Sequence, residues 1–245
     1  MTPPPRRTLP RLSAYGIALA LLTLLGVAAC TQEKPRPAPS AAASPALTTP
    51  QAELLALTRF ANYRRGTAQV TADIPVPGKS ARLTGRLDWR HGTGLALLQI
   101  DGGARDQGRH LLSWTRTTVS MQRDWTGSLP AHPPQNGWTE HPLTARASTV
   151  DTTLLLLLNL AANRPDNAQL LLHSGARHLG SEKVDGTPVT VFAGPSTTTP
   201  PGATREAART VAGRTRYWID ADGRLRRFSA HLGSGTDWLV ATLSA

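Results

Sequence analysis

A strict alternation of apolar and polar residues in two consecutive segments constrains the fold of this sequence more than any other feature. Residues 67–74 (TAQVTADI) have alanine, valine or isoleucine at every second position, and residues 80–90 (SARLTGRLDWR) continue the pattern with Leu83, Leu87 and Trp89. Successive side chains of a strand point to opposite faces of a sheet, so each segment has one apolar and one polar face. The pattern predicts antiparallel strands with one face in water.

Further segments have the composition of strands or hairpins: 94–101, 110–115, 117–122, 177–194, 214–232 and 236–243. Asp185-Gly186 and Asp222-Gly223 are favoured pairs for tight turns, so 177–194 and 214–232 are predicted hairpins.

A helix is predicted to begin with Thr49 as its N-cap and Pro50 at its first position, and to end at Gly66. Its apolar face is expected to contain Leu54, Leu57 and Ala61.

Five consecutive leucines, Leu154 to Leu158, predict a second helix that is buried on most sides and too short to span a membrane. Pro165 interrupts it, and Asp166 is expected to cap a short third helix that ends at Gly175.

Two long polar segments separate these elements. Residues 123–148 contain four prolines and two tryptophans, and either form a lid or pack as a loop held by Trp125 and Trp138. The second segment, 195–213, is expected to contain one helical turn near 205–209.

The N-terminus has the features of an export signal. Three arginines and no acidic residue precede an apolar stretch at 17–29, and Val27-Ala28-Ala29-Cys30 resembles a bacterial lipobox. The resemblance implies that Cys30, the single cysteine, receives a diacylglycerol and becomes the first residue of the mature protein. An ordinary signal peptide cleaved near Ala29 is the alternative, and the general secretory and twin-arginine routes both stay open.

These features divide the chain into three parts: a signal peptide at 1–29, the acylated cysteine with a Pro/Ala-rich tether at 30–50, and one domain at 51–245. The expected location is the extracytoplasmic face of the cell membrane. The formal net charge of +11 fits a surface lying against anionic lipid headgroups or wall polymers. Nucleic acid is not an expected partner of an exported protein.

Two C-terminal motifs carry a resemblance to a family. The first is Gly180-x-x-x-Val184-x-Gly186, and the second is Trp218-Ile219-Asp220 followed by Gly223 and Leu225. Together they resemble the actinobacterial envelope lipoproteins typified by LppX and LprG, which are relatives of the carrier LolA.

The resemblance implies an α+β fold, in which a curved antiparallel sheet forms an unclosed half-barrel with helices packed on its concave face. It also implies an apolar cavity between sheet and helices that takes a lipid or lipidated ligand, with no catalytic residue. The motif residues Val184, Gly186, Trp218, Asp220 and Gly223 are interpreted as structural. The residues expected to line the cavity are Leu83, Leu87, Leu97, Leu154, Leu157 and Leu158.

Motifs for catalysis, cofactors or metal ions are not found. The seven histidines lack metal-ligand spacing, and no H-E-x-x-H or G-x-S-x-G motif occurs. Asp220 and Asp222 flank a predicted turn and are interpreted as turn formers rather than an acid/base pair. The outward Arg82, Arg86 and Arg90 form either a headgroup-binding stripe or a solvated strand face.

The sequence leaves three hypotheses for function. The first is a non-enzymatic lipoprotein that binds or transfers an acyl ligand in its cavity, with arginines at the mouth meeting an anionic headgroup. The second is an envelope sensor or scaffold with a filled core and a protein partner. The third is a hydrolase, which no motif supports.

Overall fold

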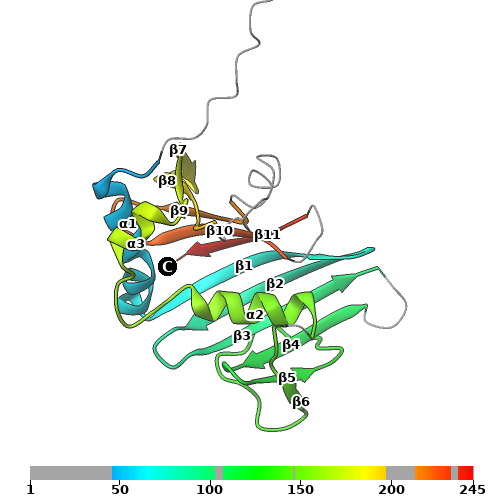
Figure 1. The fold of residues 1–245 in the computed structure, drawn as a ribbon. Coiled ribbons are helices and arrows are strands. Elements are labelled where there is room, and N and C mark those ends of the chain that lie inside the picture. Colours follow the sequence, from blue (N-terminus) through cyan, green and yellow to red (C-terminus); the bar gives the residue numbers. More distant parts are fainter. Residues whose placement is uncertain (1–45, 103–106, 146, 197–212, 233–236, 245) are drawn as a thin grey trace, which may run out of the picture. The chain divides into compact units, whose positions relative to one another are not determined.

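In the part of the chain that the structure describes, eleven antiparallel strands form one sheet, which three helices accompany (Figure 1). The computed structural model describes residues 46–102, 107–145, 147–196, 213–232 and 237–244. The first six strands are Thr67–Val76 (β1), Lys79–Asp88 (β2), Thr93–Asp101 (β3), Gly108–Trp114 (β4), Thr118–Gln122 (β5) and Thr139–Pro142 (β6). The other five are Arg177–Val184 (β7), Thr187–Ala193 (β8), Thr215–Ile219 (β9), Leu225–His231 (β10) and Trp238–Ser244 (β11).

Two meanders meet in the middle of the sheet. The spatial order is β6-β5-β4-β3-β2-β1-β11-β10-β9-β8-β7, so β1 pairs with β11 and every other pairing joins strands that are consecutive in the chain. The edge strands β6 and β7 lie at opposite ends of this order, and the sheet is not closed. The fold is therefore α+β with an open antiparallel sheet, as the sequence predicted.

The alternation seen in the sequence fixes the register of β1 and β2. Val70 faces Gly85 and Ala72 faces Leu83 across the two strands, and all four residues are buried. The intervening polar residues lie on the opposite face, where Arg82 pairs with Asp73 at 3.0 Å. The prediction of strands with one apolar and one polar face is confirmed.

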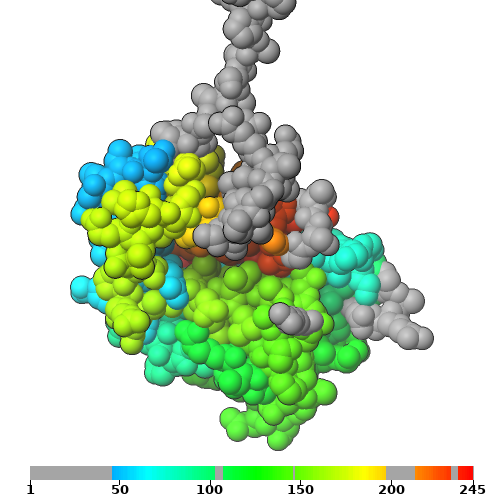
Figure 2. All heavy atoms as spheres, viewed as in Figure 1, coloured from blue at the N-terminus to red at the C-terminus, as the bar shows by residue number. Residues whose placement is uncertain are grey.

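The helices are Thr49–Arg65 (α1), Thr149–Asn159 (α2) and Ala168–His173 (α3). Figure 1 shows α2 lying across the sheet, while α1 and α3 lie side by side at one end, where Figure 2 shows their atoms in contact. The indole Nε1 of Trp89, in the turn that follows β2, donates a 3.0 Å hydrogen bond to the carbonyl of Leu157 in α2. This bond and the packing of apolar side chains tie α2 to the inner face of the sheet.

The prediction for α1 needs two corrections. Its N-cap is Thr48 rather than Thr49, and the Thr48 N–H donates to the side chain of Gln51, three residues on. Its buried face was also predicted wrongly, because Leu57 is 47% exposed whereas the polar residue Asn62 is fully buried. The predicted end at Gly66 is confirmed, since this residue has a φ of 85° that favours glycine.

The third helix begins one residue later than predicted. Asn167, not Asp166, caps α3: its side chain accepts a hydrogen bond from the N–H of Leu170. Asp166 instead forms an ion pair with Arg59 of α1.

The long segment between β5 and α2 packs against the outer face of the sheet. Arg86, which points outward from β2, donates hydrogen bonds to the carbonyls of Pro130 and Ala131. Trp125 and Trp138 each donate to a carbonyl within the same segment. These contacts favour the packed-loop interpretation over a lid.

The two C-terminal hairpins occur where the sequence places them. Asp185 and Gly186 have φ values of 48° and 77°, as a tight turn between β7 and β8 requires. Trp218 belongs to a small cluster on β7–β9 with Val184, and its Nε1 donates to Glu182 at 2.8 Å. The positions and contacts of these residues agree with a structural role.

Candidate functional site

None of the six leucines expected to line a cavity belongs to the lining of the two cavities described below. Five of them have exposures of 0–1%: Leu83, Leu87, Leu154, Leu157 and Leu158. They pack into the central core, where α2 meets the sheet. The core around these five leucines is therefore filled.

The expectation that Leu97 points inward is wrong. The register of β2 and β3 pairs Leu83 with Leu98 and Thr84 with Leu97. Leu98 therefore takes the inner face with Leu83, and Leu97 lies on the outer face. The consecutive leucines of β3 gave no alternation from which this choice could be made.

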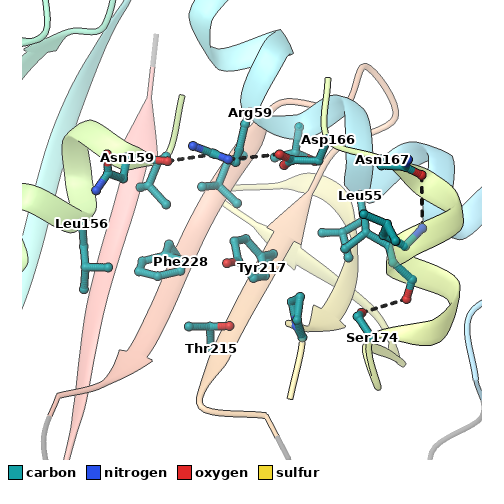
Figure 3. A pocket seen from close by; sticks show the side chains of 16 residues that line it. Leu55, Arg59, Leu156, Asn159, Asp166, Asn167, Ser174, Thr215, Tyr217 and Phe228 are labelled. Carbon is teal, nitrogen blue, oxygen red and sulfur yellow. Dashed lines mark hydrogen bonds and ion pairs between the residues drawn. The ribbon is translucent and has the colours of Figure 1, made fainter. Parts of the chain in front are cut away.

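A cavity of about 760 Å³ lies instead between the helices and the C-terminal half of the sheet (Figure 3). Three helical regions contribute to it: α1, α3 and the C-terminal end of α2. Strands β9 and β10 form the opposite wall. Its apolar lining includes Leu55, Leu156, Leu160, Leu170, Leu171, Pro195, Leu225 and Phe228.

Aromatic and hydroxyl groups line the strand side of the cavity. The rings of Tyr217 on β9 and Phe228 on β10 lie 5.3 Å apart at a tilted angle. Burial raises the pKa of the Tyr217 hydroxyl, so the neutral phenol is favoured there. Thr215, two residues before Tyr217, lines the same wall.

A hydrogen-bonded bridge joins the helices along one side of the cavity. Arg59 of α1 donates from Nε to the carbonyl of Asn159, and its Nη1 lies 3.0 Å from Asp166 Oδ1, as Figure 3 shows. Arg59 therefore connects the end of α2 with the residues that precede α3. Both partners of this ion pair are about two-fifths exposed, so the bridge forms a polar rim rather than part of the core.

A second, smaller cavity of about 340 Å³ lies beside the first turn of α2. Asp151 lines it with a side chain only 7% exposed, and its Oδ2 lies 3.5 Å from His141 Nε2. Ser148 is close, but its hydroxyl accepts from the Asp151 N–H and donates to Asp151 Oδ1. Ser148 is thus engaged as a helix cap rather than oriented by a histidine as a nucleophile.

The three outward arginines on and after β2 have different partners. Arg82 pairs with Asp73, Arg86 holds the loop on the outer face, and Arg90 donates to the carbonyl of Arg64 at the end of α1. They do not form a uniform stripe. Of the three, Arg90 lies at a groove next to the main cavity.

Asp220 has the contacts of a turn former. Its Oδ1 accepts from the N–H groups of Asp222 and Arg224, and its Oδ2 lies 2.8 Å from Arg226 Nε. These contacts stabilise the β9–β10 turn, in which Gly223 has a φ of 76°.

Within the ranges that the structure describes, no three His, Cys, Asp or Glu side chains are grouped so that they could hold a metal ion. The same ranges contain no helix with the length and hydropathy needed to cross a membrane. Cys30, the signal peptide and the helical turn predicted near 205–209 lie outside the described residues.

Sequence reasoning missed most residues of the main cavity, because they come from separate elements and share no motif. Tyr217 and Phe228 are an exception in part: they face each other across the predicted second hairpin. Pairing the two arms about Asp222-Gly223 could have placed both rings on one face.

The chain has a structural similarity to a solved protein but no match to a family model. No protein-family model and no curated protein sequence matches the chain. The fold, an open antiparallel sheet with helices packed on it, is similar to that of LprF from Mycobacterium bovis. The two share 14% sequence identity with a TM-score of 0.41, over 82% of this chain and 94% of LprF.

Proposed function

We propose that this chain is a membrane-anchored lipoprotein that holds an acyl chain in the cavity between its helices and strands β9 and β10. The observation that carries the proposal is the cavity itself. Its volume of about 760 Å³ lies within the range of roughly 300–1,000 Å³ that is usual for small-molecule sites. Leucine side chains dominate its helical side, and Phe228 covers part of the strand side.

Burial of an acyl chain there would be favourable. Each methylene removed from water contributes about 0.8 kcal/mol, so about ten buried methylenes would contribute roughly 8 kcal/mol before the cost of ordering the chain. The uncharged state favoured for Tyr217 keeps a formal charge out of this wall. The cavity therefore suits a hydrocarbon ligand with a polar group near Arg59 and Asp166.

The N-terminal sequence supports an anchor at the extracytoplasmic face. Acylation of Cys30 with a diacylglycerol would supply two chains, which is enough for stable attachment where one chain is marginal. A Cys30→Ala variant should lose the lipid mass and move from the membrane to the soluble fraction. Full retention of the variant in the membrane fraction would contradict this anchor.

The proposed activity is binding or transfer without bond cleavage. Asp220 and Ser148, which could have been taken for catalytic groups, have capping and turn contacts instead. We therefore expect the protein to release its ligand chemically unchanged.

Native mass spectrometry of the full chain, released from detergent, tests the cavity. A bound acyl ligand should appear as extra mass that is lost on denaturation, whereas a lipid covalently attached to Cys30 should remain. Leu156→Trp would place an indole in the cavity and should reduce ligand occupancy at least tenfold. Leu57→Trp is the matched control, because Leu57 is an exposed residue outside the lining.

Two results would contradict the proposal: no releasable mass on the unmodified chain, or equal occupancy in the Leu156→Trp variant.

The filled core around the buried leucines of α2 favours a second candidate function, an envelope scaffold that binds a protein partner. Absence of releasable lipid together with a specific crosslinked protein would support that candidate.

A further inference from the structure

A groove of about 440 Å³ next to the main cavity brings three arginines together. Arg59 comes from α1, Arg90 follows β2, and Arg116 lies between β4 and β5. We call this site, defined by Arg59, Arg90 and Arg116, the basic groove. Its other lining includes Tyr63, Trp89, His91, Gly92 and Asn163.

Uncharged acceptors hold Arg90 and Arg116 in position. Arg90 Nη2 donates at 2.9 Å to the carbonyl of Arg64 in the last turn of α1, and Arg116 Nη1 donates at 2.8 Å to Asn159 Oδ1. A guanidinium has five N–H donors, and each of these bonds uses one. In the ranges described, neither Arg90 nor Arg116 has a carboxylate partner.

Gly66 contributes to the position of Arg90. A Cβ atom at Gly66 would lie 3.2 Å from Arg90 Nε, so the side chain of Arg90 packs closely over the glycine that ends α1. The turn at Gly66 therefore packs against the Arg90 side chain and limits the movement of its guanidinium.

Both carboxylates near the groove already have partners, and one of these partners is Arg59 of the groove itself. Asp88 Oδ2 lies 2.7 Å from His91 Nδ1; burial acts to raise the pKa of Asp88, but the hydrogen bonds and charge of His91 outweigh it and lower the pKa. Asp166 is paired with Arg59. The groove thus has an excess of positive charge with unused donors, which suits a small anion with several oxygen atoms.

The groove and the main cavity share a boundary. Arg59 lines both, and Asn159, which accepts the hydrogen bond from Arg116, lines the cavity. An amphiphile could therefore place its anionic group among the arginines and its chain in the cavity.

We propose that the basic groove is a phosphate-binding site, in which Arg90 and Arg116 contact the phosphate oxygens and Arg59 lies at the junction with the cavity. The phosphate is either a free anion or the headgroup of a lipid. Only the lipid source rests on the proposed acyl-binding function; the site for phosphate stands without it.

The test compares three probes by titration with the full chain at constant ionic strength: inorganic phosphate, a monoacylglycerol phosphate, and the monoacylglycerol with the same acyl chain. Both lipids are used as monomers. If the headgroup is the source, the phosphate-bearing lipid should bind at least tenfold more tightly than the neutral lipid. If a free anion is the source, inorganic phosphate should bind saturably in the absence of any lipid. The two lipids should then bind with equal affinity.

Arg90→Gln/Arg116→Gln should abolish whichever preference is seen, and the lysine pair Arg90→Lys/Arg116→Lys should retain part of it, because charge remains while the planar fork is lost. Arg82→Gln is the matched control, since Arg82 is an exposed arginine paired with Asp73 and does not line the groove. Thermal unfolding of each variant checks that it is folded.

Two results overturn the proposal. In the first, the folded Arg90→Gln/Arg116→Gln variant binds phosphate-bearing probes with the affinity of the parent protein. In the second, the parent protein neither binds inorganic phosphate saturably nor binds the phosphate-bearing lipid more tightly than the neutral lipid. Loss of the preference for phosphate with continued binding of the neutral lipid would leave the cavity as an acyl site. Failure of both lipids to bind, with phosphate still bound, would remove the acyl-binding proposal and keep the groove.

Discussion

The side-chain amide of Asn62 donates a 2.8 Å hydrogen bond to the backbone carbonyl of Leu160. The amide oxygen of the same residue accepts from the N–H of Leu225 at the start of β10. Asn62 is fully buried, so one side chain on α1 satisfies backbone groups from the end of α2 and from the sheet. These two contacts fix elements that also form walls of the main cavity.

Replacement of Asn62 by alanine should destabilise the fold strongly. It leaves a buried carbonyl and a buried N–H without partners, at about 1–3 kcal/mol each, so the free energy of unfolding should fall by roughly 2–6 kcal/mol. Urea denaturation measures this change. Asn163→Ala, at an exposed residue beyond α2, is the control and should stay within about 0.5 kcal/mol. A similar effect of both variants would argue against the bridging role.

Two aspartates in the β9–β10 turn should differ sharply in their importance. Asp220 has a side-chain exposure of 6% and accepts hydrogen bonds from two backbone N–H groups and Arg226, so Asp220→Ala should cost roughly 2–4 kcal/mol. Asp222 is 71% exposed, and its contact with Arg224 is a surface ion pair. Asp222→Ala should therefore change the free energy of unfolding by no more than about 0.5 kcal/mol. Chemical denaturation of both variants gives the comparison, and equal losses would refute it.

Gly94 on β3 lies directly against the indole of Trp114. A Cβ atom at residue 94 would be 2.2 Å from Trp114 Cζ2, and Trp114 is 1% exposed, so the ring has little room to move. Gly94→Ala should reduce stability by roughly 1–3 kcal/mol. A double-mutant cycle with Trp114→Phe, which removes the clashing part of the ring, should show that the double variant loses less than the two single losses combined. Simple additivity would mean that the clash is relieved in another way.

The buried Tyr217 hydroxyl predicts a loss of stability at alkaline pH. Because the pKa in the folded state is raised, the unfolded state, with a tyrosine pKa of about 10, releases its proton first as the pH rises. The stabilisation from this group is complete below about pH 10 and is lost as the pH rises through the folded-state value. Urea unfolding at pH 8 and pH 11 should therefore show a larger loss in the parent than in Tyr217→Phe. Identical pH dependence in the two proteins would contradict the assignment.

The strands were the most predictable part of the fold. Alternation in β1 and β2 follows directly from the geometry of a half-buried strand, and the structure buries Val70, Ala72 and Leu83 as expected. The prediction of a buried Leu57 in α1 was wrong for a physical reason. The apolar periodicity favoured Leu57, but hydrogen bonds to distant backbone groups keep the polar residue Asn62 buried. A pattern of hydrophobicity does not contain that information.

The main cavity could not be predicted from single segments. Arg59, Asn159, Asp166 and Tyr217 approach one another only after α1, the end of α2 and the C-terminal strands have packed. The leucine-rich helix was correctly expected to be buried, yet its fully buried leucines fill the core, and Leu156, which is only partly buried, reaches the cavity. Whether apolar surfaces meet fully or leave a hollow depends on side-chain packing in three dimensions.

The pairing of β1 with β11 also determines when the protein can finish folding. Ala72 lies opposite Ala241, so the two meanders remain separate until the last strand has been synthesised. Before β11 pairs, one edge of β1 has unsatisfied backbone N–H and C=O groups, which makes the incomplete chain prone to mispairing. Removal of β11 (Trp238–Ser244) should therefore damage the centre of the sheet rather than trim its border.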